Sequence, residues 1–412
     1  MPSPSQPKSA LTPSELAACV SKISGTSWAA HPSGGPIVLT YSTGVPEQWL
    51  LGLSAVAHGL PLVLVGLGRR GWSWWSPAGK LPGTARALQF MNALTPSAPI
   101  VFADGGDTVV ANRWTQAEVE RTSAMIGGGN LGSSSSSSSS AVDRVITGGE
   151  CNSWPLCYNE SYLRDHSYRR CLAGSAACYP NSGTYLGRPA ALLGFVDGLK
   201  STLRRMDARG YAGRLEAEKG NDQALLHRLY LHRARHAAAT AQQPQSPAQP
   251  QPPAYSLHID GEAALFLSLF PCSGYHRYKR RGNGPFEYCH EKPFDPMRRL
   301  QSTGNGTGLV LRSMDVTGSR SSSRSSGSDG DSSHTSSRDR RPLLLHANGK
   351  HYRLHERPLA PLLSWLLSPS AAERARIERH PVLLIDSVPL GTCGVATFGS
   401  VMRGWQKRTV VP

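Results

Sequence analysis

The most regular part of the chain alternates short apolar runs with stretches of helical spacing. Residues 36–43 (PIVLTYST), 60–67 (LPLVLVGL) and 99–103 (PIVFA) are short and continuously apolar, which predicts buried strands. Between them, apolar residues recur at helical spacing, at Trp49, Leu50, Leu53, Val56 and Ala57 and again at Ala87, Met91 and Leu94. Such alternation is typical of a parallel sheet covered on both faces by helices. The pattern predicts an α/β fold with a Rossmann-like, mostly parallel sheet.

Later segments extend this pattern. Residues 183–187 predict a short strand, and the following helix places Leu192, Val196, Leu199 and Leu203 on one side. Asn221 or Asp222 is suited to cap the next helix, which runs through Tyr230. Residues 255–259 and 265–270 flank an Asp-Gly turn and predict a β-hairpin. Residues 361–367 predict a helix, and residues 381–385 predict a strand.

Other stretches contain too few large apolar residues to offset the entropy lost on ordering. They cover residues 1–13, 127–140, 237–253 and roughly 282–340. We therefore expect one α/β domain at 36–350 with disordered insertions at about 127–140, 237–253 and 282–340. Residues 1–35 are expected to be a low-order N-terminal segment, and residues 351–412 a C-terminal extension that packs on the domain.

The charge balance and the cysteines bear on partners and compartment. The formal net charge of +16 can attract nucleic acid, anionic membrane or acidic polymers, but it indicates no chemistry. No apolar run is long enough to predict a transmembrane helix, and the polar N-terminus lacks the apolar core of a signal peptide. The eight cysteines include no C-x-x-C, which disfavours zinc and leaves disulfides and free buried thiols as alternatives.

Candidate chemistry follows the third predicted strand directly. Asp104 and Asp107 stand there with two glycines between them, and ligands of open α/β sheets bind beyond the carboxyl ends of strands. Two carboxylates in one crevice repel each other unless a cation lies between them. Mn²⁺ or Mg²⁺ would fit and would also bridge to a diphosphate. For an isolated D-x-x-D, an Asp-Gly turn that caps a helix is the commoner interpretation.

The neighbouring motifs favour the metal. In order along the chain they are L-V-G-L-G-R-R-G-W (64–72), Lys80, I-V-F-A-D-G-G-D (100–107), Glu150 with Trp154-Pro155, P-N-S-G (180–183) with Y-L-G (185–187), N-D-Q (221–223), a segment at 257–266 and H-A-N-G (346–349). Their order and spacing resemble the glycosyltransferase domain of procollagen lysyl hydroxylases, a GT-A type fold. The resemblance spans roughly residues 36–350.

This resemblance implies roles at matching positions. Asp104, Asp107 and His346 would be the metal ligands. The residues that would bind the nucleotide and its diphosphate are Thr40, Thr43, Trp72 (or Trp74 or Trp75), Lys80, Asp104, Asn348, Gly349 and Lys350. Trp154, Asn181 and Asp222 would face the donor sugar and the acceptor, with Asp222 as candidate general base.

Several of these residues have structural alternatives. Trp154 could be a core anchor, Asp222 a helix cap, and Glu150 could hold a backbone amide instead of acting on substrate. The sequence also departs from the family, since its acidic run is reduced to K-G-N-D (219–222) and Ala347 replaces a glycine. The hydroxylase motif is missing, so no lysine hydroxylation is predicted.

The resemblance implies a metal-dependent hexosyltransferase. It would use Mn²⁺ or Mg²⁺ and UDP-glucose or UDP-galactose, and a hydroxyl acceptor such as a hydroxylated protein side chain or a glycoside. One alternative is a catalytically inactive scaffold that binds sugar nucleotides. A weaker one is an RNA-associated protein, suggested by the Arg/Ser tract at 320–341, although no nucleic-acid recognition fold accompanies it.

The expected compartment is the lumen of the endoplasmic reticulum or Golgi, with the cytoplasm as alternative. Two sequons, Asn159-Glu160-Ser161 and Asn305-Gly306-Thr307, fit a secretory protein, whereas the absent signal peptide opposes this.

Overall fold

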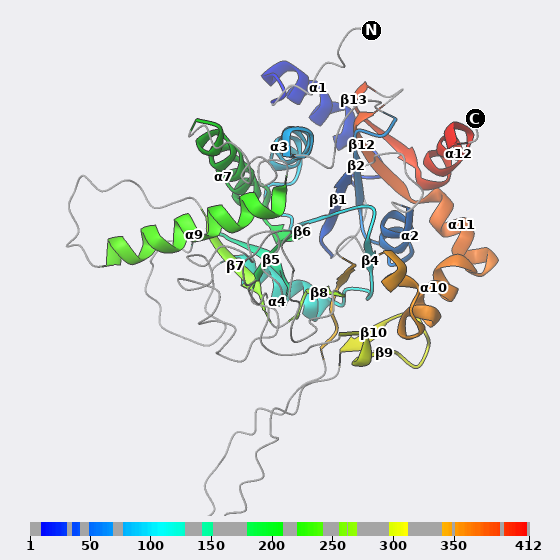
Figure 1. Cartoon of the computed structure of the whole chain (residues 1–412). Coiled ribbons are helices and arrows are strands. Elements are labelled where there is room, and N and C mark those ends of the chain that lie inside the picture. Colours follow the sequence, from blue (N-terminus) through cyan, green and yellow to red (C-terminus); the bar gives the residue numbers. More distant parts are fainter. Residues whose placement is uncertain are drawn as a thin grey trace, which may run out of the picture.

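The structure, a computed structural model, is shown in Figure 1. It describes residues 10–30, 35–41, 49–68, 77–127, 142–150, 179–208, 221–241, 255–261, 263–269, 296–311, 340–347, 351–387 and 391–409. An eight-stranded sheet has the order β13-β12-β2-β1-β3-β6-β5-β7. Its strands are β1 (Ile37–Tyr41), β2 (Leu62–Val65), β3 (Ile100–Ala103), β5 (Arg144–Glu150), β6 (Tyr179–Gly187), β7 (Ser256–Asp260), β12 (Pro381–Ser387) and β13 (Gly391–Thr397).

The strand directions determine where functional groups gather. Strands β12, β2, β1 and β3 are parallel, so their carboxyl ends lie at one edge of the sheet. Strand β6 is antiparallel to both β3 and β5, which places the start of β6 and the end of β5 at that same edge. Strand β7 runs parallel to β5 and also ends there. This edge is called the carboxyl edge below.

Two smaller sheets complete the strands. One contains β4 (Thr108–Val110), β11 (Leu344–His346) and β8 (Phe266–Ser268), and the other pairs β9 (Leu300–Ser302) with β10 (Leu309–Leu311). The described helices are α1 (Pro13–Ser24), α2 (Trp49–Ala57), α3 (Pro77–Leu94), α4 (Gln116–Ile126), α7 (Pro189–Ala208), α9 (Asp222–Ala241), α10 (Ala360–Leu367), α11 (Ala371–Arg379) and α12 (Phe398–Thr409). Short 3-10 helices lie at Pro296–Arg298, His351–His355 and Arg357–Leu359.

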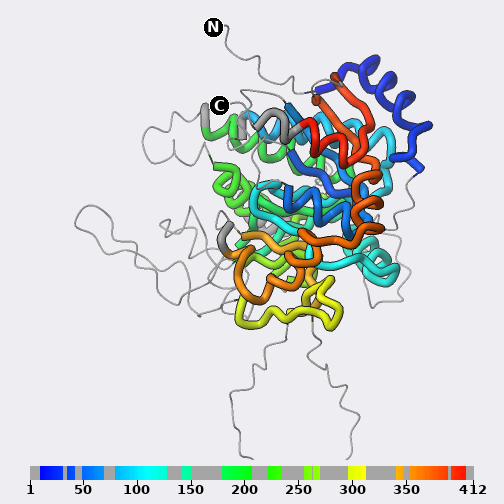
Figure 2. The backbone as a smooth tube through the Cα atoms, turned by 90° about the vertical axis from the view of Figure 1, so that its right-hand side faces the viewer, coloured from blue at the N-terminus to red at the C-terminus, as the bar shows by residue number. Residues whose placement is uncertain are grey.

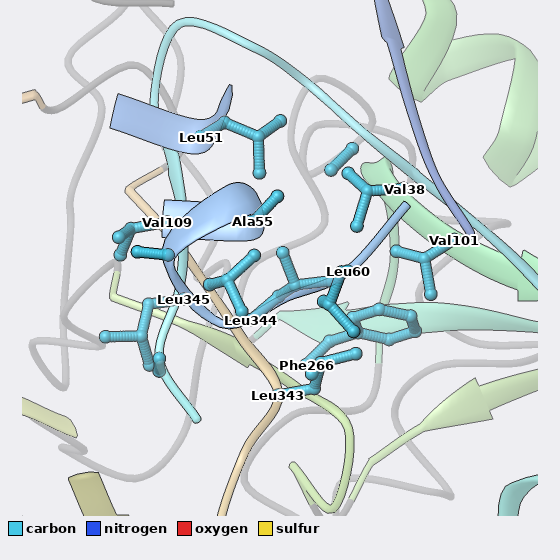
Figure 3. Close-up of a cluster of buried hydrophobic side chains, with 14 of the residues drawn as sticks. Val38, Leu51, Ala55, Leu60, Val101, Val109, Phe266, Leu343, Leu344 and Leu345 are labelled. Atoms are coloured by element: carbon cyan, nitrogen blue, oxygen red, sulfur yellow. The ribbon is translucent and has the colours of Figure 1, made fainter. Parts of the chain in front are cut away.

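Alternate residues of the central strands enter two separate cores. In β1, Leu39 belongs to the core that contains residues of α1, α3, α7 and α9, whereas Val38 belongs to the core that contains residues of α2, α10, α11 and α12. Figure 1 shows these two groups of helices on opposite sides of the sheet. Figure 3 shows the second core, where Val38 and Val101 of the sheet meet Leu51 and Ala55 of α2. The predicted α/β, Rossmann-like sheet with helices on both faces is confirmed.

The hairpin predicted for residues 255–270 is wrong. Strand β7 joins the large sheet beside β5, while β8 joins the small sheet beside β11. The cause is Asp260, which is buried and whose carboxylate accepts hydrogen bonds from the backbone N–H groups of Ala264, Leu265 and Phe266. These bonds replace a cross-strand ladder and turn the chain from one sheet into the other.

Two segments that were expected to have little order contain regular structure. Helix α1 lies within residues 1–35, where Thr12 and Glu15 form a capping box and Cys19 is disulfide-bonded to Cys393. Residues 296–311 lie within the insertion expected at 282–340 and form β9, β10 and a 3-10 helix. Four of their apolar residues are buried in the core: Met297, Leu300, Leu309 and Leu311.

The C-terminal extension contributes strands to the main sheet. Strand β12 pairs in parallel with β2, and β13 pairs antiparallel with β12. Helix α12 then packs against α11, as the orange and red segments of Figure 2 show.

Candidate metal centre at the carboxyl edge

Asp104 and Asp107 lie in the turn that leaves β3. The four residues of β3 are all buried, and Asp104 follows immediately, with its backbone N–H donating to the Gly183 carbonyl of β6 at 2.8 Å. Asp107 precedes β4 and is buried. The turn therefore directs both carboxylates to the carboxyl edge.

His346 reaches this turn through the small sheet. Strand β11 pairs antiparallel with β4 so that His346 lies opposite Thr108, and the Ala347 N–H donates to the Asp107 carbonyl at 2.8 Å. The His346 Nε2 lies 3.2 Å from Asp107 Oδ1. One ligand atom each from Asp104, Asp107 and His346 lie within 4.8 Å of one another. The three predicted metal ligands thus come together, although His346 is far from the other two in sequence.

Gly183 provides the space for the imidazole. A Cβ at this position would lie 2.5 Å from His346 Nε2 and 2.9 Å from Nδ1, well inside van der Waals contact. The ring is buried, and its Nδ1 makes no hydrogen bond to any residue in the described ranges. The absence of a side chain in β6 is therefore a steric requirement for the position of His346.

The electrostatics of the three residues favour a cation. Burial raises the pKa of Asp104 above its ordinary value, Lys80 opposes this, and the carboxylates of Asp222 and Asp107 raise it further. Burial opposes a charge on His346, but the Asp107 carboxylate raises the pKa of the imidazole through its charge and its hydrogen bond. A divalent ion among these groups would relieve the repulsion between the carboxylates and displace the proton from the imidazole.

Lys80 lies between two of the acidic residues. It projects from α3, is buried, donates to Asp104 Oδ1 at 2.7 Å and forms a short ion pair with Asp222. Its ammonium group lies 5.1 Å from the centre of the Phe102 ring. Burial alone would lower the pKa of Lys80, but Asp104 and Asp222 hold it well above its ordinary value. Lys80 therefore remains charged at the site.

Asp222 is the first residue of α9, and it does not cap the helix. The cap comes from Asn221, whose Oδ1 accepts from the Ala224 N–H at 3.1 Å. The carboxylate of Asp222 is consequently available to Lys80. Burial works against its ionisation, but Lys80 lowers the pKa of Asp222 below its ordinary value.

Asn181 and Glu150 belong to a buried hydrogen-bond network beside the acidic turn. Asn181 accepts from the Gly183 N–H at 2.8 Å and donates to Glu150 Oε2 at 3.3 Å. Gln223 makes a short hydrogen bond to Glu150, donates to the Pro180 carbonyl at 2.6 Å and accepts from the Ser182 N–H at 2.6 Å. The network fixes the first half of β6 and with it the position of Gly183, which leaves room for the His346 ring.

Thr40 lies in β1 but is not joined to this cluster by any hydrogen bond within the described part of the chain. Its hydroxyl is buried and unpartnered among the described residues. The adjacent Tyr41 contacts the cluster instead, and its hydroxyl donates to Asp104 Oδ1 at 2.8 Å. The predicted role of Thr40 at a nucleotide remains a prediction.

Tyr41 was not predicted as a site residue from the sequence, and Gly183 and Gln223 were predicted only as parts of motifs. The position of Tyr41 at the carboxyl end of a predicted strand was the available signal. Other predicted site residues lie outside the described residues: Thr43, Trp72, Trp154, Asn348, Gly349 and Lys350.

Comparisons of the chain with protein-family models and with curated proteins gave no match. Among the helices of the described ranges, none has both the length and the apolar character needed to cross a bilayer.

Proposed function

We propose that this protein is a metal-dependent glycosyltransferase that moves a hexose from a UDP-sugar to a hydroxyl acceptor. The observation that supports the proposal most directly is the approach of Asp104, Asp107 and His346, whose ligand atoms lie within 4.8 Å of one another. The site formed by these three residues lies beyond the carboxyl ends of parallel strands, which is where open α/β sheets bind nucleotides.

The three side chains fit a divalent ion. Carboxylate oxygens suit Mn²⁺ and Mg²⁺, and the imidazole favours the softer Mn²⁺. The Nε2 of His346 faces the Asp107 carboxylate, 3.2 Å from its Oδ1, and the buried Nδ1 has no partner in the described ranges. When bound there, the ion would supply positive charge for the diphosphate of the donor.

Lys80 is the protein's own cation at this site. Its ammonium group is buried and is held by two carboxylates, so moving it to a diphosphate would exchange one set of anionic partners for another. We propose that Lys80 binds the diphosphate oxygens and stabilises the charge that develops on the departing nucleoside diphosphate.

If Lys80 moved to the diphosphate, the basicity of the Asp222 carboxylate would also change. While Lys80 is paired with Asp222, the ionised form of the Asp222 carboxylate is stabilised, so Asp222 is a weak base. Once Lys80 turns to the diphosphate, Asp222 would regain basicity, and we propose that it then accepts the proton of the acceptor hydroxyl. Asn181 lies nearby in β6 and is proposed to contact the sugar.

A direct test measures UDP release from UDP-glucose and UDP-galactose by the purified full chain, with Mn²⁺, with Mg²⁺ and with a chelator. We expect hydrolysis that requires the metal and falls at least about 100-fold in Asp107→Asn, because a metal ligand is lost. The control is Asp197→Asn, which changes a carboxylate that is 67% exposed on α7.

The outcomes separate the alternatives. Equal turnover by Asp107→Asn and wild type would contradict the proposal. Metal-dependent binding of UDP-sugar without turnover, toward water or toward hydroxyl acceptors, would indicate a sugar-nucleotide-binding scaffold. No binding of UDP-sugars in the presence of Mn²⁺ would exclude both.

A further inference from the structure

The sequon Asn305-Gly306-Thr307 occupies the turn of the β9–β10 hairpin. Asn305 is exposed, and the backbone reverses at Gly306, whose φ is +71° and whose N–H donates to the Thr303 carbonyl at 2.8 Å. In Figure 2 this hairpin is the yellow segment at the lower edge of the coloured tube. The acceptor amide is therefore presented at the surface of the molecule, as a modified sequon requires.

The side-chain hydrogen bonds of Asn305 to other described residues use only the amide oxygen, Oδ1. Its Oδ1 accepts from the Thr303 hydroxyl at 2.9 Å and from the Thr307 N–H at 3.3 Å. Its Nδ2 donates no hydrogen bond within the described ranges. N-glycosylation replaces a hydrogen on Nδ2 and leaves Oδ1 unchanged, so the turn would keep both hydrogen bonds after modification.

The base of the hairpin is anchored to the body of the protein. Asn112 donates to the Leu309 carbonyl at 2.8 Å and to the Pro342 carbonyl at 2.7 Å, and it accepts from the Leu309 N–H at 3.0 Å. Asn112 lies just after β4, whereas Asp107 lies just before it. The base of the hairpin and the Asp107 carboxylate are therefore connected to opposite ends of β4.

A second observation points independently to the same compartment. Cys19 of α1 and Cys393 of β13 form a buried disulfide between residues 374 positions apart. Disulfides persist in oxidising compartments such as the lumen of the endoplasmic reticulum and are rare in the cytosol. In Figure 1, α1 and β13 lie at the end of the molecule opposite the β9–β10 hairpin.

We infer that Asn305 is an N-glycosylation site and that the protein passes through the oxidising lumen of the secretory pathway. The donor would be an oligosaccharide carried on a lipid diphosphate. In the transfer, Asn305 Nδ2 forms a bond to the anomeric carbon while the bond from that carbon to the diphosphate oxygen breaks. The diphosphate leaves with the bonding electrons, and the amide proton passes to a base of the transferring enzyme.

The test expresses the full chain in a eukaryotic cell. We expect peptide N-glycosidase to increase its electrophoretic mobility and, in ¹⁸O-water, to convert Asn305 to labelled aspartate detectable by peptide mass spectrometry. Asn305→Gln and Thr307→Ala should each lose this glycan. Thr303→Val keeps the sequon and removes one hydrogen bond to Oδ1, so it should retain the glycan, and Asn159→Gln, which changes the other sequon, should also retain the glycan at Asn305.

Mass spectrometry of the wild type decides the matter even if a variant fails to fold. Recovery of the peptide with unmodified Asn305 would overturn the inference, whether Cys19 and Cys393 are oxidised or reduced. Loss of the glycan in Thr303→Val would contradict the expectation that modification at Nδ2 does not need the hydrogen bond from Thr303 to Oδ1. None of these measurements depends on glycosyltransferase activity.

Discussion

The imidazole of His346 packs directly against the backbone of Gly183, at a position where any side chain would overlap the ring. These residues belong to different sheets, β11 in the small one and β6 in the large one. Their contact is the point at which the small sheet places His346 at the carboxyl edge of the large sheet. The geometry of the candidate metal centre therefore depends on a glycine that binds no metal itself.

Gly183→Ala should weaken metal binding without unfolding the protein. The added methyl group would push the His346 ring away from Asp107. Substituting a residue that positions a metal ligand typically lowers metal affinity by about 10- to 100-fold. The overpacking should also lower the free energy of unfolding by about 1–3 kcal/mol. Calorimetric titration with Mn²⁺ and denaturant unfolding would measure both effects.

Gly404→Ala is the matched control for that variant, because nothing lies within 4 Å of a Cβ there. It should bind Mn²⁺ as the wild type does. Unchanged Mn²⁺ affinity in Gly183→Ala would mean that His346 is not a ligand.

Mn²⁺ affinity should rise with pH through the raised pKa of His346. The Asp107 carboxylate favours the protonated imidazole, and the proton must leave before the nitrogen can bind a metal. The affinity should therefore keep increasing above pH 6.5, the ordinary value for histidine. In His346→Gln, titration with Mn²⁺ between pH 6 and 9 should show weaker binding and a flatter profile. A wild-type affinity that is constant over this range would contradict the prediction.

The same histidine should make the metal-free protein less stable at high pH. Its pKa is higher in the folded protein than in the unfolded chain, so its contribution to stability is fully present below the unfolded pKa. That contribution is lost as the pH rises through the folded pKa. Chemical unfolding in the presence of a chelator should show this loss in the wild type and not in His346→Gln.

Lys80→Met should destabilise the protein, because it leaves Asp104 and Asp222 without their shared cation. Removing one partner of a fully buried pair costs about 3–5 kcal/mol, but these carboxylates are each 23% exposed, so a loss of about 2–3 kcal/mol in unfolding free energy is expected. The control, Lys200→Met, removes the partner of the exposed Asp197 and should cost less than about 1 kcal/mol. Equal losses in the two variants would show that Lys80 has no special electrostatic role.

The part of the fold that sequence predicts best is the part fixed by local pattern. Strands β1, β2 and β3 are short, almost continuously apolar runs, which is the pattern expected of buried strands. The resemblance implied a role for Thr40 and none for the adjacent Tyr41, and the apolar pattern could not correct this. When every residue of a strand is buried, the pattern does not reveal which face each residue occupies, and here Tyr41 is the one that contacts Asp104.

Contacts between distant segments were predictable only through the resemblance or not at all. Asn221 and Asp222 are both suited to cap α9, and the assignment depends on Lys80, which lies 142 residues away and engages Asp222. The hairpin error has a similar origin. The spacing of residues 255–270 fits a hairpin locally, but the buried Asp260 carboxylate and the pairing of β8 with β11 favour two separate sheets.

The Cys19–Cys393 disulfide should contribute substantially to stability because it ties the first helix to the C-terminal hairpin across 374 residues. A cross-link over a long segment restricts the unfolded chain, and losing it typically costs about 2–5 kcal/mol. The double variant Cys19→Ser, Cys393→Ser should therefore unfold at lower denaturant than the oxidised wild type. Adding a reductant should destabilise the wild type more than the double variant, and the difference should match the effect of the substitutions. Equal unfolding free energies for the variant and the oxidised wild type would show that packing of α1 on α3, and not the disulfide, holds this helix in place.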